Sequence, residues 1–446
     1  MPIYTYYLTP DDYGVLNVIL SIVSLLSVLF LLSLHGAASR FHFLEEYANK
    51  KKKLWGTIVV IVILNSATLG TMAILFHTFL IDPLAKGIGF FPLLFIAILT
   101  TILNPLYLLY QTYLQTTQDG KRYSINMLVN FLLNVGLILF FVIIEKKGVI
   151  GILFANLITA IVFFFYSIIA FLPKIKLSIN KTIAKQSLKY SAPLIPHSVS
   201  GWIMAMIDRL MLNNLNGTYN TGIYSAGYQI GSSLNAVTSS VTQAYSPWFY
   251  QNIQSIEGKN KIFMFAEKFT FLYCVIALIL ALFSPEICKL MLNAEFFEAY
   301  KVIPLVAFGY VYSGVYSFFI STLFLKKTYF VPIVTFTSAL IGVILNIFLI
   351  PRLGIIGAGF SCYISFFVSA IMAYILSKRE NISFNFFKTI GVSILFFVIS
   401  MVIYLPLSYE KMLILKICIF LSIVYIFIYN NKQLINKFIN QIKANN

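Results

Sequence analysis

The chain has 446 residues, of which 59% are hydrophobic and only 11% are charged. Soluble domains carry about 25% charged residues, so this composition excludes an ordinary soluble protein and indicates a membrane protein. The formal net charge of +17 would also fit a nucleic-acid-binding protein, and the placement of the basic residues decides between the two classes.

Apolar runs of about 20 residues recur along the whole sequence, and each is long enough to cross about 30 Å of hydrocarbon. Solid runs of this kind are typical of transmembrane helices, whereas strands of a membrane barrel would alternate weakly over about ten residues. We therefore predict an all-α, polytopic transmembrane bundle. Thirteen spans are predicted, at 13–34, 54–80, 88–114, 123–145, 148–172, 190–213, 220–250, 265–285, 300–325, 329–350, 355–377, 385–407 and 410–430.

Most basic residues lie in alternate loops, on one predicted side of the membrane. Examples are Lys50–Lys53, Lys121 with Arg122, the run 174–189, and the tail lysines such as Lys432. The positive-inside rule assigns this side to the cytoplasm, together with the C-terminus. The net charge is thus a topology signal, and nucleic acid is not an expected partner.

The N-terminus of the sequence has no basic residue before its first predicted span. Thirteen spans and a cytoplasmic C-terminus would leave Met1 outside, and residues 1–12 look like the end of an outgoing helix. We therefore expect that a first helix is missing from this chain.

The two halves of the sequence resemble each other. An offset of 206 pairs Gly148 with Gly354, and an offset of 208 pairs Gly14 with Gly222. Counting the missing helix, the repeat has six helices, so both copies share one orientation and are related by an axis along the membrane normal. We expect two parallel six-helix lobes around a central cavity, plus two C-terminal helices. The predicted domains are an N-terminal lobe at 1–172 that lacks its first helix, a cytoplasmic basic interlobe loop at 173–189, a C-terminal lobe at 190–377, two extra helices at 378–430 and a cytoplasmic tail at 431–446.

Asp208 and Arg209 form an adjacent charged pair inside a predicted span. Each ionisable residue in a bilayer core costs about 2.5–3.5 kcal/mol on insertion scales, so such residues are usually functional. Asp208 lies 12 residues beyond Pro196, about 18 Å along a helix axis, which places the pair in the outer half of the membrane. One residue of the pair could face the cavity while the other braces it, or Asp208 could titrate. Alternatively, the pair could form interfacial ion pairs with neighbouring helices.

The next span carries polar residues at steps of three or four, which place them on one helical face. This face could line a hydrated cavity that contacts sugar hydroxyls, or it could be a helix-packing face, since Gly227 and Gly231 are close by. Arg40, at the inner end of the first span, could meet an anionic head group or could anchor the span by snorkelling. The polar face comprises Tyr228, Ser232, Asn235, Ser239, Thr242 and Ser246, flanked by Gln229 and Gln243.

Motifs for catalysis and metal binding are lacking in the sequence. There is no G-x-x-x-x-G-K-[ST] loop and no H-E-x-x-H pair, and the four cysteines lack C-x-x-C spacing. The longest outer loop, about 286–299, is too short for a membrane glycosyltransferase. We expect no enzyme, no cofactor and no metal.

Several motifs resemble bacterial polysaccharide-biosynthesis flippases (Wzx-type) of the multidrug/oligosaccharidyl-lipid/polysaccharide exporter superfamily. They are Leu8–Gly14, Lys189–Ser198 with Gly201–Trp202, Ile207–Arg209, Gly222–Tyr224 and Ser246–Phe249. The resemblance implies two six-helix lobes that move undecaprenyl-diphosphate-linked O-antigen or capsule repeat units to the outer leaflet by alternating access, driven by an ion.

The resemblance also implies roles for the polar residues. Arg209 and Arg40 would hold the diphosphate, because arginine binds phosphate groups bidentately. Tyr228, Asn235 and Gln243 would contact the sugars, and Asp208 would be the proton or sodium site. Expected partners are the lipid-linked oligosaccharide, membrane lipids, and a glycan polymerase with its assembly proteins. The alternatives are a multidrug exporter of the same superfamily and an inactive scaffold in a polysaccharide assembly complex.

Overall fold

The computed structural model describes residues 2–326, 330–377, 386–405, 411–419 and 421, and these residues form helices and connecting turns without a strand. The first bundle contains α1 (Pro2–Tyr7), α2 (Pro10–Leu31), α3 (Leu34–Phe41), η1 (Glu45–Lys50), α4 (Lys51–Leu75), α5 (His77–Leu80), η2 (Phe90–Leu94), α6 (Phe95–Thr116), α7 (Gly120–Leu139), η3 (Phe140–Ile144), α8 (Gly148–Phe171), η4 (Leu172–Lys174) and α9 (Lys181–Ser191). The second contains α10 (Leu194–Gly231), α11 (Leu234–Asn252), α12 (Ile256–Leu282), α13 (Ser284–Met291), η5 (Ala294–Lys301), α14 (Ile303–Lys326), α15 (Phe330–Leu353), α16 (Ile355–Ser377), α17 (Phe386–Ser400) and η7 (Met401–Tyr404).

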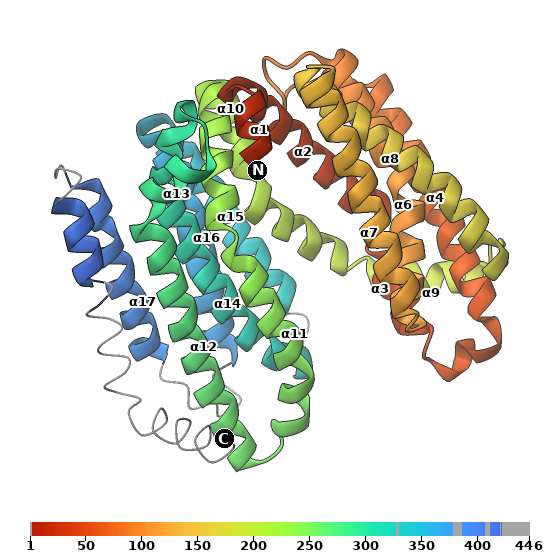
Figure 1. The fold of residues 1–446 in the computed structure, drawn as a ribbon. Coiled ribbons are helices and arrows are strands. Elements are labelled where there is room, and N and C mark those ends of the chain that lie inside the picture. The colour runs from red at the N-terminus through yellow and green to blue at the C-terminus, as the bar shows by residue number, and fades with distance from the viewer. Residues whose placement is uncertain (1, 327–329, 378–385, 406–410, 420, 422–446) are drawn as a thin grey trace, which may run out of the picture.

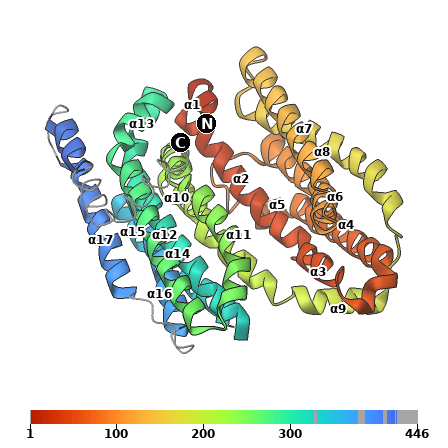
Figure 2. The same ribbon diagram turned by 60° about the horizontal axis from the view of Figure 1, so that its bottom comes forward.

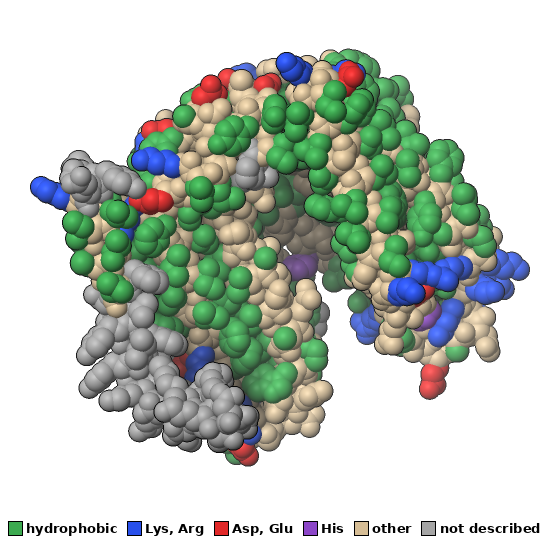
Figure 3. All heavy atoms as spheres, in the orientation of Figure 1, with side chains coloured by type: hydrophobic (Ala, Val, Ile, Leu, Met, Phe, Trp, Pro, Cys, Tyr) green, Lys and Arg blue, Asp and Glu red, His purple; other side chains and the backbone are tan. Residues whose placement is uncertain are grey.

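The two bundles diverge from a shared end, where α1, α2 and α10 meet (Figures 1 and 2). Figure 3 shows a deep cleft between them, closed at this end and open at the other. Each bundle has its own buried apolar core, because the helices turn apolar faces toward one another within the bundle. The predicted all-α bundle of two lobes is confirmed.

Nine helices among the described residues are long and apolar enough to cross a membrane. They are Pro10–Leu31, Glu45–Leu75, Phe90–Thr116, Gly120–Ile144, Gly148–Lys174, Ile256–Leu282, Ile303–Leu325, Phe330–Leu353 and Ile355–Ser377. Each overlaps a predicted span, while the predicted total of thirteen spans stays a prediction. The predicted span 410–430 and the tail 431–446 lie largely outside the described residues.

Helix α10 is a hairpin of two arms. Gly217 interrupts it with φ 85° and ψ 173°, a conformation that glycine adopts without a side-chain clash. The first arm corresponds to the predicted span 190–213. The predicted span 220–250 is the second arm followed by α11, and a break at Ser232–Ser233 separates the two helices.

The interlobe segment predicted as a loop, 173–189, contains most of helix α9, so the prediction of a loop is corrected. Asn180 caps this helix by accepting a hydrogen bond from the backbone N–H of Ile183. Ile183, Ser187 and Ser191 are buried on one face of the helix. This buried face, which contacts α3 and α4, explains why the segment is helical rather than extended.

Helix α2 begins at a capping box. Thr9 accepts a hydrogen bond from the N–H of Asp12 at 3.2 Å, and Pro10 occupies the first turn. This start fixes the N-terminal turns of α2 against the second arm of α10. There, a Cβ on Gly14 would lie 1.9 Å from the carbonyl oxygen of Thr218, and a Cβ on Gly222 would lie 1.9 Å from that of Pro10.

These contacts are reciprocal, because the repeat offset of 208 relates Pro10 to Thr218 and Gly14 to Gly222. The glycines that open α8 and α16 also match, since Gly148 has φ 53° and Gly354 has φ 56°. Equivalent positions of the sequence repeat thus adopt equivalent conformations. The crossing of α2 with α10 lies at the closed end of the cleft, and we call it the glycine crossing.

Candidate functional site

Asp208 is buried in the first arm of α10, with only 3% of its surface exposed. Both carboxylate oxygens accept hydrogen bonds. Tyr224 Oη donates to Oδ2 at 2.7 Å, and Asn346 Nδ2 on α15 donates to Oδ1 at 2.6 Å. The hairpin places Tyr224 opposite Asp208, because the two residues lie on different arms at equal sequence distances from position 216.

Arg209 is also buried, with 4% of its surface exposed. Its Nη1 donates to the Ala205 carbonyl oxygen at 2.7 Å and contacts the Met206 sulfur at 3.2 Å. The guanidinium carbon lies 4.2 Å from the centroid of the Tyr228 ring, a cation–π contact.

Neither member of this pair forms an ion pair with any residue that the structure describes. The two side chains point in different directions because adjacent helical residues are about 100° apart. Asp208 points toward Tyr224 and Asn346, while Arg209 points toward Tyr228. The interpretation as interfacial ion pairs with neighbouring helices is therefore wrong for this conformation.

Tyr228, on the second arm of α10, connects Arg209 to α14. Its hydroxyl lies 2.8 Å from the hydroxyl of Tyr310 on α14, and its ring lies 5.8 Å from that of Tyr224. The Tyr310 ring is in turn 5.2 Å from Phe366 on α16. We call Asp208, Arg209, Tyr224, Tyr228 and Asn346 the polar cluster. Because Tyr224 is two residues from Gly222, the cluster lies next to the glycine crossing.

The other predicted site residues lie elsewhere. Arg40 is exposed on α3, with its guanidinium carbon 4.9 Å from the centroid of the Tyr190 ring on α9. Asn235 and Gln243 are exposed on α11, which lies on the side of the second bundle that faces the first bundle in Figures 1 and 2. The predicted polar face is not continuous, because the break at Ser232–Ser233 interrupts the helical period between Tyr228 and the rest of the face.

Sequence reasoning missed the roles of Tyr224 and Asn346. Tyr224 belongs to the Gly222–Tyr224 motif, which contributes to the family resemblance but suggests no role for this tyrosine. Asn346 is one of several asparagines in spans, and its contact with Asp208 bridges 138 residues of sequence. Its buried Oδ1 has no hydrogen-bond partner, so an acceptor stands beside the Asp208 carboxylate.

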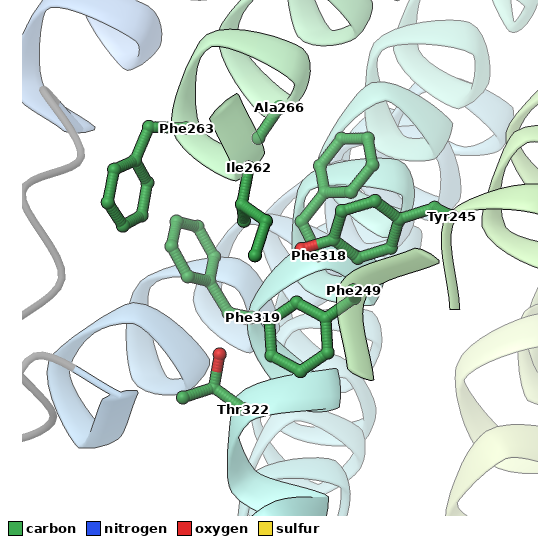
Figure 4. A pocket seen from close by; sticks show the side chains of 8 residues that line it. All are labelled: Tyr245, Phe249, Ile262, Phe263, Ala266, Phe318, Phe319 and Thr322. Atoms are coloured by element: carbon green, nitrogen blue, oxygen red, sulfur yellow. The ribbon is translucent and has the colours of Figure 1, made fainter. Parts of the chain in front are cut away.

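Two pockets lie away from the polar cluster. One lies inside the second bundle among aromatic side chains of α11, α12 and α14 (Figure 4), but its volume of about 10 Å³ leaves room for little more than a water molecule. The other has a volume of about 500 Å³ and lies between α1 and the α13–η5 segment. Neither contains a residue of the polar cluster. The cleft between the bundles is therefore the candidate substrate path.

Two helical bundles around a cleft open at one end, with nine apolar membrane-spanning helices among the described residues, define a multi-pass membrane protein. The sequence matches the family model described as polysaccharide biosynthesis protein over residues 1–253, more than half of the chain. The chain belongs to this family, and its resemblance to polysaccharide-biosynthesis flippases is confirmed.

One curated relative and two solved structures are consistent with this family membership. The capsular polysaccharide biosynthesis protein CapF of Staphylococcus aureus is 27% identical over 215 residues, which are 46% of this chain and 53% of CapF. The match thus spans about half of CapF's length. A structure of the lipid II flippase MurJ in an inward closed conformation has a TM-score of 0.66 at 17% identity, covering 96% of this chain and 98% of MurJ. An inward-facing multidrug resistance transporter of the MATE family has a TM-score of 0.69 at 14% identity, covering 85% of this chain and 93% of its own. Both show the shared fold.

Proposed function

We propose that this protein is a flippase for lipid-linked oligosaccharides. Its substrate would be an undecaprenyl-diphosphate-linked O-antigen or capsule repeat unit, carried across the cytoplasmic membrane by alternating access. Membership of the polysaccharide biosynthesis family and the likeness to CapF support the substrate class. The likeness to MurJ supports a fold that such a lipid-linked head group fits.

The observation that carries the proposal is the Arg209 guanidinium. It is buried next to the closed end of the cleft, and no described carboxylate lies within 4 Å of it. A buried cation without a counter-ion is costly, and a diphosphate would supply that counter-ion with bidentate geometry. The other two nitrogens of this guanidinium, Nε and Nη2, have no hydrogen-bond partner among the described residues, and neither is fully buried. They are the donors left for an anion.

The proposed path begins at the open, cytoplasmic end of the cleft. Arg40 would meet the diphosphate first, because it is exposed there beside α9. Asn235 and Gln243 on α11 would then contact the sugar hydroxyls along the cleft. The head group would reach Arg209 and Tyr228 last. Gly217, at the hairpin tip, is eight positions beyond Arg209, which is about 12 Å along the helix axis.

Asp208 would couple this movement to a proton or a sodium ion. The two oxygens of its carboxylate and the unpaired Oδ1 of Asn346 provide three oxygen atoms in a buried place, with the Tyr224 hydroxyl as a fourth. Oxygen ligands of this kind suit a hard cation, and a proton on the carboxylate would equally remove its charge.

Flipping by the purified chain in vesicles tests the substrate and the role of Arg209. The readout is the exposure of lipid-linked oligosaccharide to an added lectin. We expect Arg209→Glu to abolish flipping, because the reversed charge repels the diphosphate. The matched control Lys121→Glu, an exposed site on α7, should flip at the wild-type rate. Normal flipping by Arg209→Glu would reduce this arginine to a structural residue, and export of a cationic dye without flipping would instead indicate a multidrug exporter.

Imposed ion gradients test the coupling. We expect wild-type flipping to accelerate with an inward proton or sodium gradient, and we expect Asp208→Asn to lose that acceleration because it cannot carry a charge. Full, pH-independent flipping by Asp208→Asn would contradict the assignment of the ion site.

A further inference from the structure

Helix α9 runs across the end of the first bundle at a steep angle to the bundle helices (Figures 1 and 2). The extended segment before it is fastened to α4. The Lys176 N–H donates to the Lys52 carbonyl oxygen at 2.9 Å, and Thr57 Oγ1 donates to the Ser178 carbonyl oxygen at 2.8 Å. Residues 176–191, which we call the connector, are thus held against the first bundle and lead directly into α10.

The connector has a basic face turned away from the bundle. Lys181, Lys185 and Lys189 are exposed and lie four residues apart, so they form one row. This row lies nearly opposite the buried row of Ile183 and Ser187 on the helix. Figure 3 shows lysine and arginine side chains gathered at this end of the first bundle.

Large apolar side chains of the connector are exposed as well, two of them just before this row of lysines and one within it. The exposed fractions are 53% for Leu177, 63% for Ile179 and 38% for Leu188. No ion pair involves a connector lysine in the part of the chain that the structure describes. Glu46 is near α9, but its carboxylate accepts a hydrogen bond from Gln186 Nε2 at 3.3 Å rather than pairing with a lysine.

We propose that the connector is a docking surface for the anionic phospholipid head groups of the membrane in which the protein sits. A helix that lies across the bundle end, with lysines around exposed leucine and isoleucine, has the chemistry of an interfacial segment. The lysines bind the phosphates, while the apolar side chains enter the boundary between head groups and acyl chains. Zwitterionic lipid has no net negative charge to attract the row of lysines, so the surface favours anionic lipid.

This docking has a consequence for α10. The connector ends at Ser191, and α10 begins at Leu194. Lipid that holds the connector therefore holds the start of the helix that carries Asp208 and Arg209. The membrane composition would then set how freely the second bundle moves against the first. The inference concerns lipid binding and stands independently of the transported substrate.

Amide hydrogen exchange of the full chain in nanodiscs tests the docking. The probes are nanodiscs of phosphatidylcholine alone and of phosphatidylcholine mixed with phosphatidylglycerol. We expect amides of residues 176–191 to exchange more slowly in the anionic nanodiscs. The difference should vanish in about 1 M salt, where the Debye length is only about 3 Å.

The triple variant Lys181→Gln/Lys185→Gln/Lys189→Gln should lose this protection, because each lysine removed weakens the attraction about fivefold. The matched control, Lys121→Gln/Lys259→Gln/Lys268→Gln, removes the same charge from other sites on α7 and α12 and should keep the protection. Equal exchange of the wild-type connector in the two lipid mixtures would overturn the proposal. Protection that survives in the first triple variant, or is lost equally in the control, would overturn it as well.

Discussion

The glycine crossing predicts a specific effect of adding one methyl group. Alanine at Gly14 would place its Cβ 1.9 Å from the Thr218 carbonyl oxygen, whereas ordinary contact begins at 3.4 Å. The helices must therefore separate by roughly 1.5 Å. Overpacking of this kind costs about 1–3 kcal/mol. We expect Gly14→Ala and Gly222→Ala to destabilise the closed crossing and to shift the equilibrium about 5- to 150-fold toward a state in which this end of the cleft is open.

Spin-label distance measurements would detect the shift. Thr182 on α9 and Gln251 on α11 are exposed and belong to different bundles. Labels at these positions, in a chain whose exposed Cys418 is replaced by serine, report the separation of the bundles away from the crossing. If one end of the cleft closes as the other opens, Gly14→Ala should add a shorter distance to the distribution.

The control is another glycine that has free space around it. A Cβ on Gly201, in the first arm of α10, would meet no atom within 4 Å. Gly201→Ala should leave both the distances and the flipping rate unchanged. Wild-type distances in both Gly14→Ala and Gly222→Ala, in protein that remains folded, would refute the prediction that the glycine crossing holds this end of the cleft closed.

Two further predictions concern other contacts. Lys416 is buried and its Nζ lies 2.9 Å from both carboxylate oxygens of Glu286, so Glu286→Gln should lower the free energy of unfolding by about 3–5 kcal/mol and lower the melting temperature. The control Glu298→Gln, at the exposed pair with Lys301, should cost less than about 1 kcal/mol. Equal losses of stability in the two variants would contradict this prediction. Burial lowers the pKa of His42 below 6.5, with a smaller contribution from a nearby lysine, and its Nδ1 accepts from Trp55 Nε1 at 3.1 Å. Neutral His42 therefore stabilises the fold above pH 6.5, and this contribution is lost as pH falls through the lowered pKa. In a chain whose other tryptophans are phenylalanine, Trp55 fluorescence should change on acidification, and His42→Asn should abolish that change.

Much of the fold could be predicted because its requirements are local. A membrane span needs an apolar run, and a tight turn or a close helix crossing needs glycine. These features can therefore be recognised in the sequence. The repeat pairs Gly14 with Gly222 and Gly148 with Gly354, and the structure gives each pair equivalent surroundings or dihedral angles. That the first two glycines contact each other's helices could not be read from the repeat, because an offset relates positions without stating whether they meet.

The candidate site was predictable in part for a similar reason. Asp208 and Arg209 stood out through the cost of burying charge, and Tyr228 stood out through helical spacing. Asn346 did not, because its contact with Asp208 depends on how α15 packs against α10. Asn235 was grouped with Tyr228 by a period that assumes one continuous helix, and the break at Ser232–Ser233 ends that period.

The hairpin at Gly217 joins the polar cluster to the glycine crossing. The same reversal of the chain brings Tyr224 onto Asp208 and brings Gly222, two residues earlier, onto α2. A change in the charge of Asp208 therefore reaches the glycine crossing through one short piece of backbone. We expect Asp208→Asn, which alters the hydrogen bond with Tyr224 at 2.7 Å, to change the spin-label distances that Gly14→Ala changes. If Asp208→Asn removed gradient dependence and left those distances unaltered, the cluster and the crossing would act separately, and coupling would have to pass through α15 instead.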